Sequence, residues 1–287
     1  MKNKYSNKIS QATNSATKIG RYATDEEIKK FSYLVPNYEW FTKLESMQSF
    51  GYTDAENLKG ESGIGLCEYV SLAMLIKYQE LFYNYGYFTD KEYDNYFELQ
   101  KNNSREINMP IHKYYEFNDK SDSFVARLWE LNNRKIDLWW GVNVDDTLRK
   151  WIKGKEIKKR IAIKSCLSIG HTSQPEAKMM KHNVPVMLSF VAYGLAHNVV
   201  IYGYDKKTKS YLVHFGWSSD WRKRNCAVII EKSKVWHYYS RGFWNAFYPK
   251  TSKKIIAPKP RFEYDGKMHT WDEIKKKGLS FKDVKPY

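Results

Sequence analysis

The chain has 287 residues and carries 48 Lys and Arg against 32 Asp and Glu, which gives a formal net charge of +16. This length is enough to bury one large hydrophobic core with appendages. The three cysteines are odd in number and widely spaced, which argues against a disulfide framework and against a zinc motif.

The amino-terminal segment, residues 1–21, is polar and rich in Lys, Ser, Asn and Thr, and we expect it to be flexible. It suits either a secreted protein whose signal has been removed or a cytoplasmic protein with a loose tail, so the compartment stays open. The sequence contains no apolar run long enough to span a membrane and no apolar signal-peptide centre. Short apolar patches between residues 22 and 60 then indicate a segment that packs beside the next helix.

The most informative stretch, residues 65–76, places Cys67 at the start of an almost wholly apolar helix. The first turn of a helix presents unpaired N–H groups and a partial positive charge, which favour a thiolate and lower the thiol pKa. We therefore expect Cys67 to be a reactive nucleophile. The alternative is a buried structural cysteine that behaves as a small apolar side chain. The other two cysteines, Cys166 and Cys226, are either free or paired.

Apolar residues at helical spacing predict two further helices at residues 123–132 and 144–152, and a short third helix at 176–182. Apolar runs then predict strands at 184–190, 197–204, 211–217, 226–230 and 242–247. Helices followed by antiparallel strands indicate an α+β fold, with a central buried helix packed against an antiparallel sheet and an active cleft between the two layers.

Two histidines lie on the predicted hairpin formed by the second and third of these strands. A two-residue loop at Asp205 and Lys206 would place residue 197 opposite residue 214. Directly opposed residues point to the same face of a sheet, so this register predicts that His197 and His214 are neighbours.

The order of these segments resembles the papain-like cysteine peptidase superfamily, and within it the compact bacterial branch around streptopain and the bacteriocin-processing double-glycine peptidases. The likeness covers roughly residues 31–248. It implies that Cys67 is the nucleophile and His197 the general base, and that His214 takes the position of the Asn or Asp that orients the imidazole. Trp217, in the following aromatic-Gly-Trp segment, is either a wall of the cleft or a core anchor.

Two positions depart from the family pattern. The family usually has a glutamine six residues before the cysteine, whose amide donates to the oxyanion, and this chain has Glu61 there. The backbone N–H of Cys67 with another side chain is one alternative donor. His214 brings no negative charge to stabilise an imidazolium. The sequence and the resemblance predict a thiol peptidase. The alternatives are a Cys-His amidase or acyltransferase on a non-protein amide, and a catalytically inactive binding protein.

The expected organisation is a flexible segment at 1–21, a catalytic domain at 22–248, and a basic linker with a short helix at 249–287. Thr270 and Glu273 form a capping-box pattern in that helix. The positive charge predicts attraction to an anionic surface, without a specific nucleic-acid module. No cofactor and no metal are predicted. The expected partner is a peptide or protein substrate, and the sequence does not indicate an oligomeric state.

Overall fold

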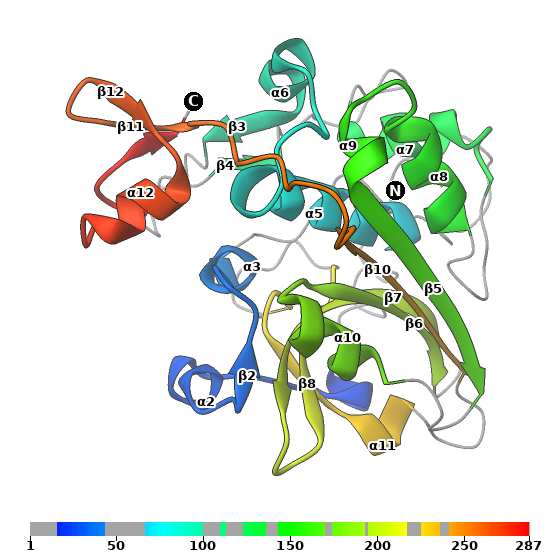
Figure 1. The fold of residues 1–287 in the computed structure, drawn as a ribbon. Coiled ribbons are helices and arrows are strands. Elements are labelled where there is room, and N and C mark those ends of the chain that lie inside the picture. The colour runs from blue at the N-terminus through cyan, green and yellow to red at the C-terminus, as the bar shows by residue number, and fades with distance from the viewer. Residues whose placement is uncertain are drawn as a thin grey trace, which may run out of the picture.

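A computed structural model describes the fold of most of the chain (Figure 1). The described residues are 16–43, 67–99, 110–112, 123–135, 143–169, 174–192, 195–216, 225–235 and 241–286. Within them a large antiparallel sheet packs against one buried helix, α5 (Cys67–Phe82), which lies near the centre of the molecule in Figure 1. The predicted α+β class, with a central helix on an antiparallel sheet, is confirmed.

The main sheet has the order β1-β9-β8-β7-β6-β10-β5, with β2 pairing to β7 in addition. Its strands, in sheet order, are β1 (Arg21–Tyr22), β9 (Val228–Glu231), β8 (Ser210–His214), β7 (Leu195–Asp205), β6 (Val186–Ala192), β10 (Arg241–Pro249) and β5 (Ile161–Ile169), with β2 at Tyr33–Leu34. All of these pairs are antiparallel. The strands that carry His197 and His214 therefore lie side by side in the middle of the sheet.

Helix α5 is buried over its whole length, including its polar residues Glu68, Lys77, Gln79 and Glu80. A helix that is covered on every side needs apolar residues all round rather than along one stripe, and the Cys67–Ile76 sequence supplies them. On one side it contacts β6 and β7, and on the others it contacts α7 (Phe124–Leu131) and α8 (Asn143–Trp151). The start of this helix is consequently held by the core itself.

Further helices cover both faces of the sheet. Helix α10 (Pro175–His182) contacts β6, β7 and β10. The carboxylate of its Glu176 accepts a hydrogen bond of 2.9 Å from the Tyr211 hydroxyl of β8. Since Tyr211 lies an odd number of residues from His214, α10 covers the sheet face that His214 does not. The remaining short elements are α2 (Asp25–Lys29), α3 (Glu39–Lys43), α6 (Asp90–Tyr96), α9 (Ile157–Arg160), α11 (Lys232–Val235), β3 (Phe97–Leu99) and β4 (Pro110–His112).

The carboxyl-terminal part forms a small unit of β11 (Phe262–Tyr264), β12 (Lys267–His269), β13 (Lys285–Pro286) and α12 (Trp271–Lys276). Figure 1 shows it on the opposite side of α5 from α7 and α8. Trp271 stacks on Phe281 at 3.8 Å between centroids and packs edge-on against Phe82 at the end of α5. Thr270 and Glu273 form the predicted capping box. This unit is thus docked on the core.

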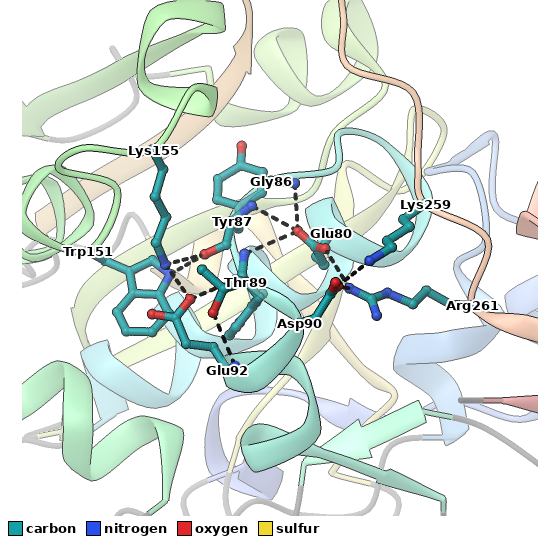
Figure 2. A network of polar contacts seen from close by, with 11 residues as sticks. Glu80, Gly86, Tyr87, Thr89, Asp90, Glu92, Trp151, Lys155, Lys259 and Arg261 are labelled. Atoms are coloured by element: carbon teal, nitrogen blue, oxygen red, sulfur yellow. Dashed lines mark hydrogen bonds and ion pairs between the residues drawn. The ribbon is translucent and has the colours of Figure 1, made fainter.

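A buried polar network joins the end of α5 to the chain that leads into this unit (Figure 2). One oxygen of the Glu80 carboxylate accepts hydrogen bonds from the backbone N–H groups of Gly86, Tyr87 and Phe88 at 2.9, 2.8 and 3.4 Å. The other oxygen lies 3.6 Å from the Arg261 guanidinium. Burial raises the pKa of Glu80 to about 7 in spite of these favourable partners.

Two segments differ from what the sequence predicted. Ala16 and Ile19, within the segment expected to be flexible, are buried in the core, because their apolar side chains fall on one side of a short helical turn. Strand β5 was not predicted, yet it pairs with β10 over nine residues. Its alternating Ile161 and Ile163 lie at the end of a lysine-rich run that obscured the strand pattern.

No helix in the described ranges is long and apolar enough to cross a bilayer.

Candidate active site

Cys67 is the first residue of α5, and its sulfur meets the side chain of a strand residue from the other half of the chain. The Asn198 amide, on β7, donates a hydrogen bond of 3.1 Å from Nδ2 to Cys67 Sγ. Cys67 is 7% exposed and Asn198 is 6% exposed. The centre of the candidate site is therefore a thiol at the start of a buried helix, in contact with an amide on a central strand.

A serine on the neighbouring strand fixes the orientation of this amide. Ser189 of β6 lies directly opposite Asn198 in the β6–β7 pair, and its hydroxyl donates to Asn198 Oδ1. With Oδ1 occupied by a donor, Nδ2 is turned towards the sulfur. Sequence analysis did not identify either residue, although Asn198 stands beside the predicted base and an Asn within an apolar strand is itself an unusual signal.

The pKa of the Cys67 thiol is not lowered, although its position at the start of a helix predicted this. Burial raises the pKa of Cys67 to about 11, and the neighbouring Glu68 carboxylate adds to the rise, whereas the Asn198 hydrogen bond lowers it. The expectation of a lowered pKa was therefore wrong for this conformation. The loss of water around the sulfur outweighs the partial positive charge of the helix end.

His197 lies immediately before Asn198, and side chains alternate between the two faces of a strand. Its ring packs against Phe215 and Phe190 at 4.5 and 6.2 Å between centroids. Nε2 lies 2.7 Å from the Phe215 carbonyl oxygen. Because a carbonyl only accepts, Nε2 carries the proton and Nδ1 holds the lone pair. Burial lowers the pKa of His197 to about 4, so the imidazole is neutral.

His214 occupies a different register from the predicted one. Asp205 pairs with Ser210, so the hairpin loop has four residues rather than two, and Val200 rather than His197 lies opposite His214. The cause is the Asp205 carboxylate, which accepts from the Thr208 N–H and hydroxyl at 3.0 and 2.6 Å and stabilises the longer turn. A register irregularity between Ile201 and Gly203 adds to the shift.

The corrected register still places His214 close to the site. Directly opposed residues share a face, so His214 lies on the face of Val200 and, two residues earlier, of Asn198. His214 is fully buried, and its Nδ1 accepts a hydrogen bond of 3.1 Å from the Gly216 N–H. Nδ1 is therefore unprotonated, and a neutral His214 has its proton on Nε2.

A profile of the Peptidase C39-like family matches residues 35–243, which is well over half of the chain and includes Cys67, His197 and His214. The chain belongs to the Peptidase C39-like family. This confirms the predicted membership of the papain-like cysteine peptidase superfamily and makes a peptidase activity the general expectation for the protein. A comparison with curated proteins found no match.

Two predicted site residues of this Peptidase C39-like protein, Glu61 and Trp217, lie outside the described residues. Cys67, Cys166 and Cys226 form no disulfide in the part of the chain that the structure describes, and Cys226 donates from Sγ to the Thr42 carbonyl at 3.0 Å. In the described ranges no group of three or more His, Cys, Asp or Glu side chains is arranged to hold a metal ion.

Proposed function

We propose that this protein hydrolyses peptide bonds with Cys67 as the nucleophile, through a thioester acyl-enzyme. The observation that carries the proposal is the hydrogen bond from Asn198 to Cys67 Sγ, which joins residues 131 positions apart in the chain. It brings the start of the central helix against the residue that follows His197. Membership of the Peptidase C39-like family supports the same reaction class.

His197 is the proposed general base. Its tautomer suits this role, because Nε2–H is held by the Phe215 carbonyl while Nδ1 keeps the lone pair that accepts a proton. In the described conformation the ring packs against Phe190 and Phe215. Because side chains alternate along a strand, this ring lies on the face opposite Asn198 and the Cys67 sulfur. In this proposal the start of β7 rearranges to bring the imidazole to the sulfur, and the described arrangement is a resting state with a neutral thiol and a neutral imidazole.

The proposed reaction then has two halves. His197 takes the proton of the Cys67 thiol, and the thiolate attacks the peptide carbonyl to form a C–S bond. The C–N bond breaks as the imidazolium returns its proton to the leaving amine. Water, deprotonated by the same imidazole, attacks the thioester, and the thiolate leaves and regains the proton.

In this proposal the Phe215 carbonyl orients the His197 ring. The resemblance had implied that the preceding residue, His214, has this role. A carbonyl at 2.7 Å fixes the ring and its tautomer as a side-chain oxygen would. His214 remains a proposed contributor on the Asn198 face of the sheet. Its Nε2 proton makes it a donor there rather than a base.

The test is cleavage of a mixed peptide library, read by mass spectrometry, with the wild type and three variants. Cys67→Ala should abolish cleavage, and His197→Ala should lower it by about 10²-fold or more, as expected for loss of a general base. His214→Ala is the matched control, a buried histidine whose removal should cost less than that of His197. Cleavage that persists in Cys67→Ala would reject the proposal.

A catalytically inactive binding protein is the second candidate. The observation that favours it is the pair of pKa values, about 11 for Cys67 and about 4 for His197, which correspond to two neutral groups rather than to an ion pair. A folded wild type that cleaves no member of the library would favour this candidate over the peptidase.

A further inference from the structure

Thioester formation creates a negatively charged oxygen, and a peptidase site needs a neutral or positive donor for it. The family's usual glutamine is replaced by Glu61, whose ionised carboxylate has no proton to donate and would repel the charge. The backbone N–H of Cys67, in the first described turn of α5, is one candidate donor, because the first N–H groups of a helix point out of its end. A second donor has to come from elsewhere in the site.

We propose that the side-chain amide of Asn198 is that second oxyanion donor, an inference that rests on the proposed function of Cys67. Nδ2 lies 3.1 Å from Cys67 Sγ. In the tetrahedral intermediate the oxyanion is bonded to the carbon that is itself bonded to Sγ. An N–H group that already contacts the sulfur is therefore within reach of this oxygen when the carbonyl arrives.

The amide is prepared for this role before any substrate binds. The Ser189 hydroxyl donates to Asn198 Oδ1, and the two residues are directly paired across β6 and β7. Both are buried, at 3% and 6% exposed. A donor held by two central strands and a second hydrogen bond loses little freedom when it meets the oxyanion, which is the condition for strong electrostatic stabilisation.

The two neighbouring residues of β7 have different tasks in this proposal. His197 handles the proton and Asn198 only donates a hydrogen bond, so no proton is transferred to or from the amide. The amide is uncharged at every working pH, unlike a carboxylate at position 61. Ser189 acts through Asn198 and is a positioning residue.

Two small probes separate this role from a general effect on the thiol. p-Nitrophenyl acetate acylates a thiol through a tetrahedral oxyanion, whereas iodoacetamide alkylates it by direct displacement without one. The rate of each reaction at Cys67 is read by peptide mass at several pH values in the wild type, Asn198→Ala and Asn198→Asp. Asn198→Asp keeps the shape of the side chain and removes the donor, so it serves if the alanine variant does not fold.

In both variants the rate of acylation should fall by about 10²-fold or more relative to the rate of alkylation at equal thiolate fraction, as for the loss of one oxyanion donor. Ser189→Ala should lower the same ratio in part, and Ser189→Thr, which keeps the hydroxyl, should restore it. If both reactions slow down equally, Asn198 acts only on the thiol. If neither reaction changes, Asn198 does not contact the oxyanion. Either result overturns the inference.

Failure of the proposed function gives a different result. A folded wild type that cleaves no peptide, although its Cys67 still reacts with both probes, would show that the site is not a peptidase. The ratio between the two probes still reports on Asn198 in that case, because it compares two reactions at the same sulfur.

Discussion

Glu80 and Arg261 are an ion pair at the edge of the core, 3.6 Å apart, with each residue less than one tenth exposed. Arg261 also lies over the ring of Tyr93 at 3.6 Å and contacts Asp90 at 3.4 Å. The pair joins the central helix to the segment that leads into the carboxyl-terminal unit. Burial raises the pKa of the Glu80 carboxyl to about 7.

The first prediction is that Glu80 makes folding stability depend on pH. The folded-state pKa is raised above the usual 4.5, so the folded protein holds a proton that the unfolded chain has lost. This contribution is present below about pH 4.5 and is lost as pH rises through about 7. Relative to Glu80→Gln, the wild type should lose on the order of 2 kcal/mol of unfolding free energy across this range.

Urea unfolding of both proteins at about pH 3, 4.5, 6 and 7.5 measures this difference and also covers the range in which the control below titrates. Glu27→Gln is a control of opposite sign, because hydrogen bonds in the Thr24 capping box lower the pKa of that carboxylate. The stability due to Glu27 is present above its usual pKa and fades in more acidic solution. A wild-type minus Glu80→Gln difference that does not change with pH would contradict the prediction.

The second prediction concerns the reactivity of the resting thiol. Because burial raises the pKa of Cys67 to about 11, its alkylation by iodoacetamide should be slow near pH 7 and should increase up to about pH 11. Asn198→Ala should move the rise to still higher pH, since the amide hydrogen bond favours the thiolate. The less buried Cys166 is the internal control. Labelling of Cys67 that reaches its plateau below pH 8 would refute the assignment of a resting state.

The third prediction is that Trp271 anchors the carboxyl-terminal unit. Trp271→Ala removes its stacking on Phe281 and its contact with Phe82, and should cost about 3–5 kcal/mol of unfolding free energy. Trp271→Phe keeps a ring but loses the 2.9 Å hydrogen bond from the indole N–H to Asn37 Oδ1, and should cost about 1–2 kcal/mol. Urea unfolding ranks the two. Equal costs would mean that the ring stack contributes little.

The fourth prediction concerns the turn that sets the register of β7 and β8. Asp205→Ala removes the acceptor for Thr208 and for the Ser32 hydroxyl, which donates at 2.7 Å, and should cost about 1–2 kcal/mol. Asp205→Asn keeps one oxygen and should recover part of this loss. Thermal unfolding compares the variants. An alanine variant as stable as the wild type would show that the turn does not depend on this side chain.

Elements with strong local signals were predictable from the sequence. The central helix is described from Cys67 onward, where the sequence changes from a glycine-rich segment to an almost wholly apolar run. Residues 123–132 were predicted to be helical because Phe124, Leu128 and Leu131 share one side, and α7 covers nearly the same span. In both cases local propensity and tertiary packing agree.

Features that depend on the environment of a side chain were not predictable in the same way. The hairpin register depends on hydrogen bonds of Asp205 and on an irregularity in β7, and one residue of shift changes which side chains share a face. The pKa of Cys67 depends on how completely α5 is covered, which no local pattern reports. Asn198 was overlooked because its role follows from contacts with Ser189 and Cys67, which lie on other elements.

The burial of α5 along its full length has a consequence for how the site can change. Cys67 is the first residue of a helix that packs against the sheet, against α7 and α8, and against the carboxyl-terminal unit. We therefore expect substitutions on the protein surface to have little effect on the position of the sulfur. New substrate preferences in such a scaffold have to come from the residues that surround the sulfur, so a designer can vary the walls of the site while treating the nucleophile as a fixed reference point.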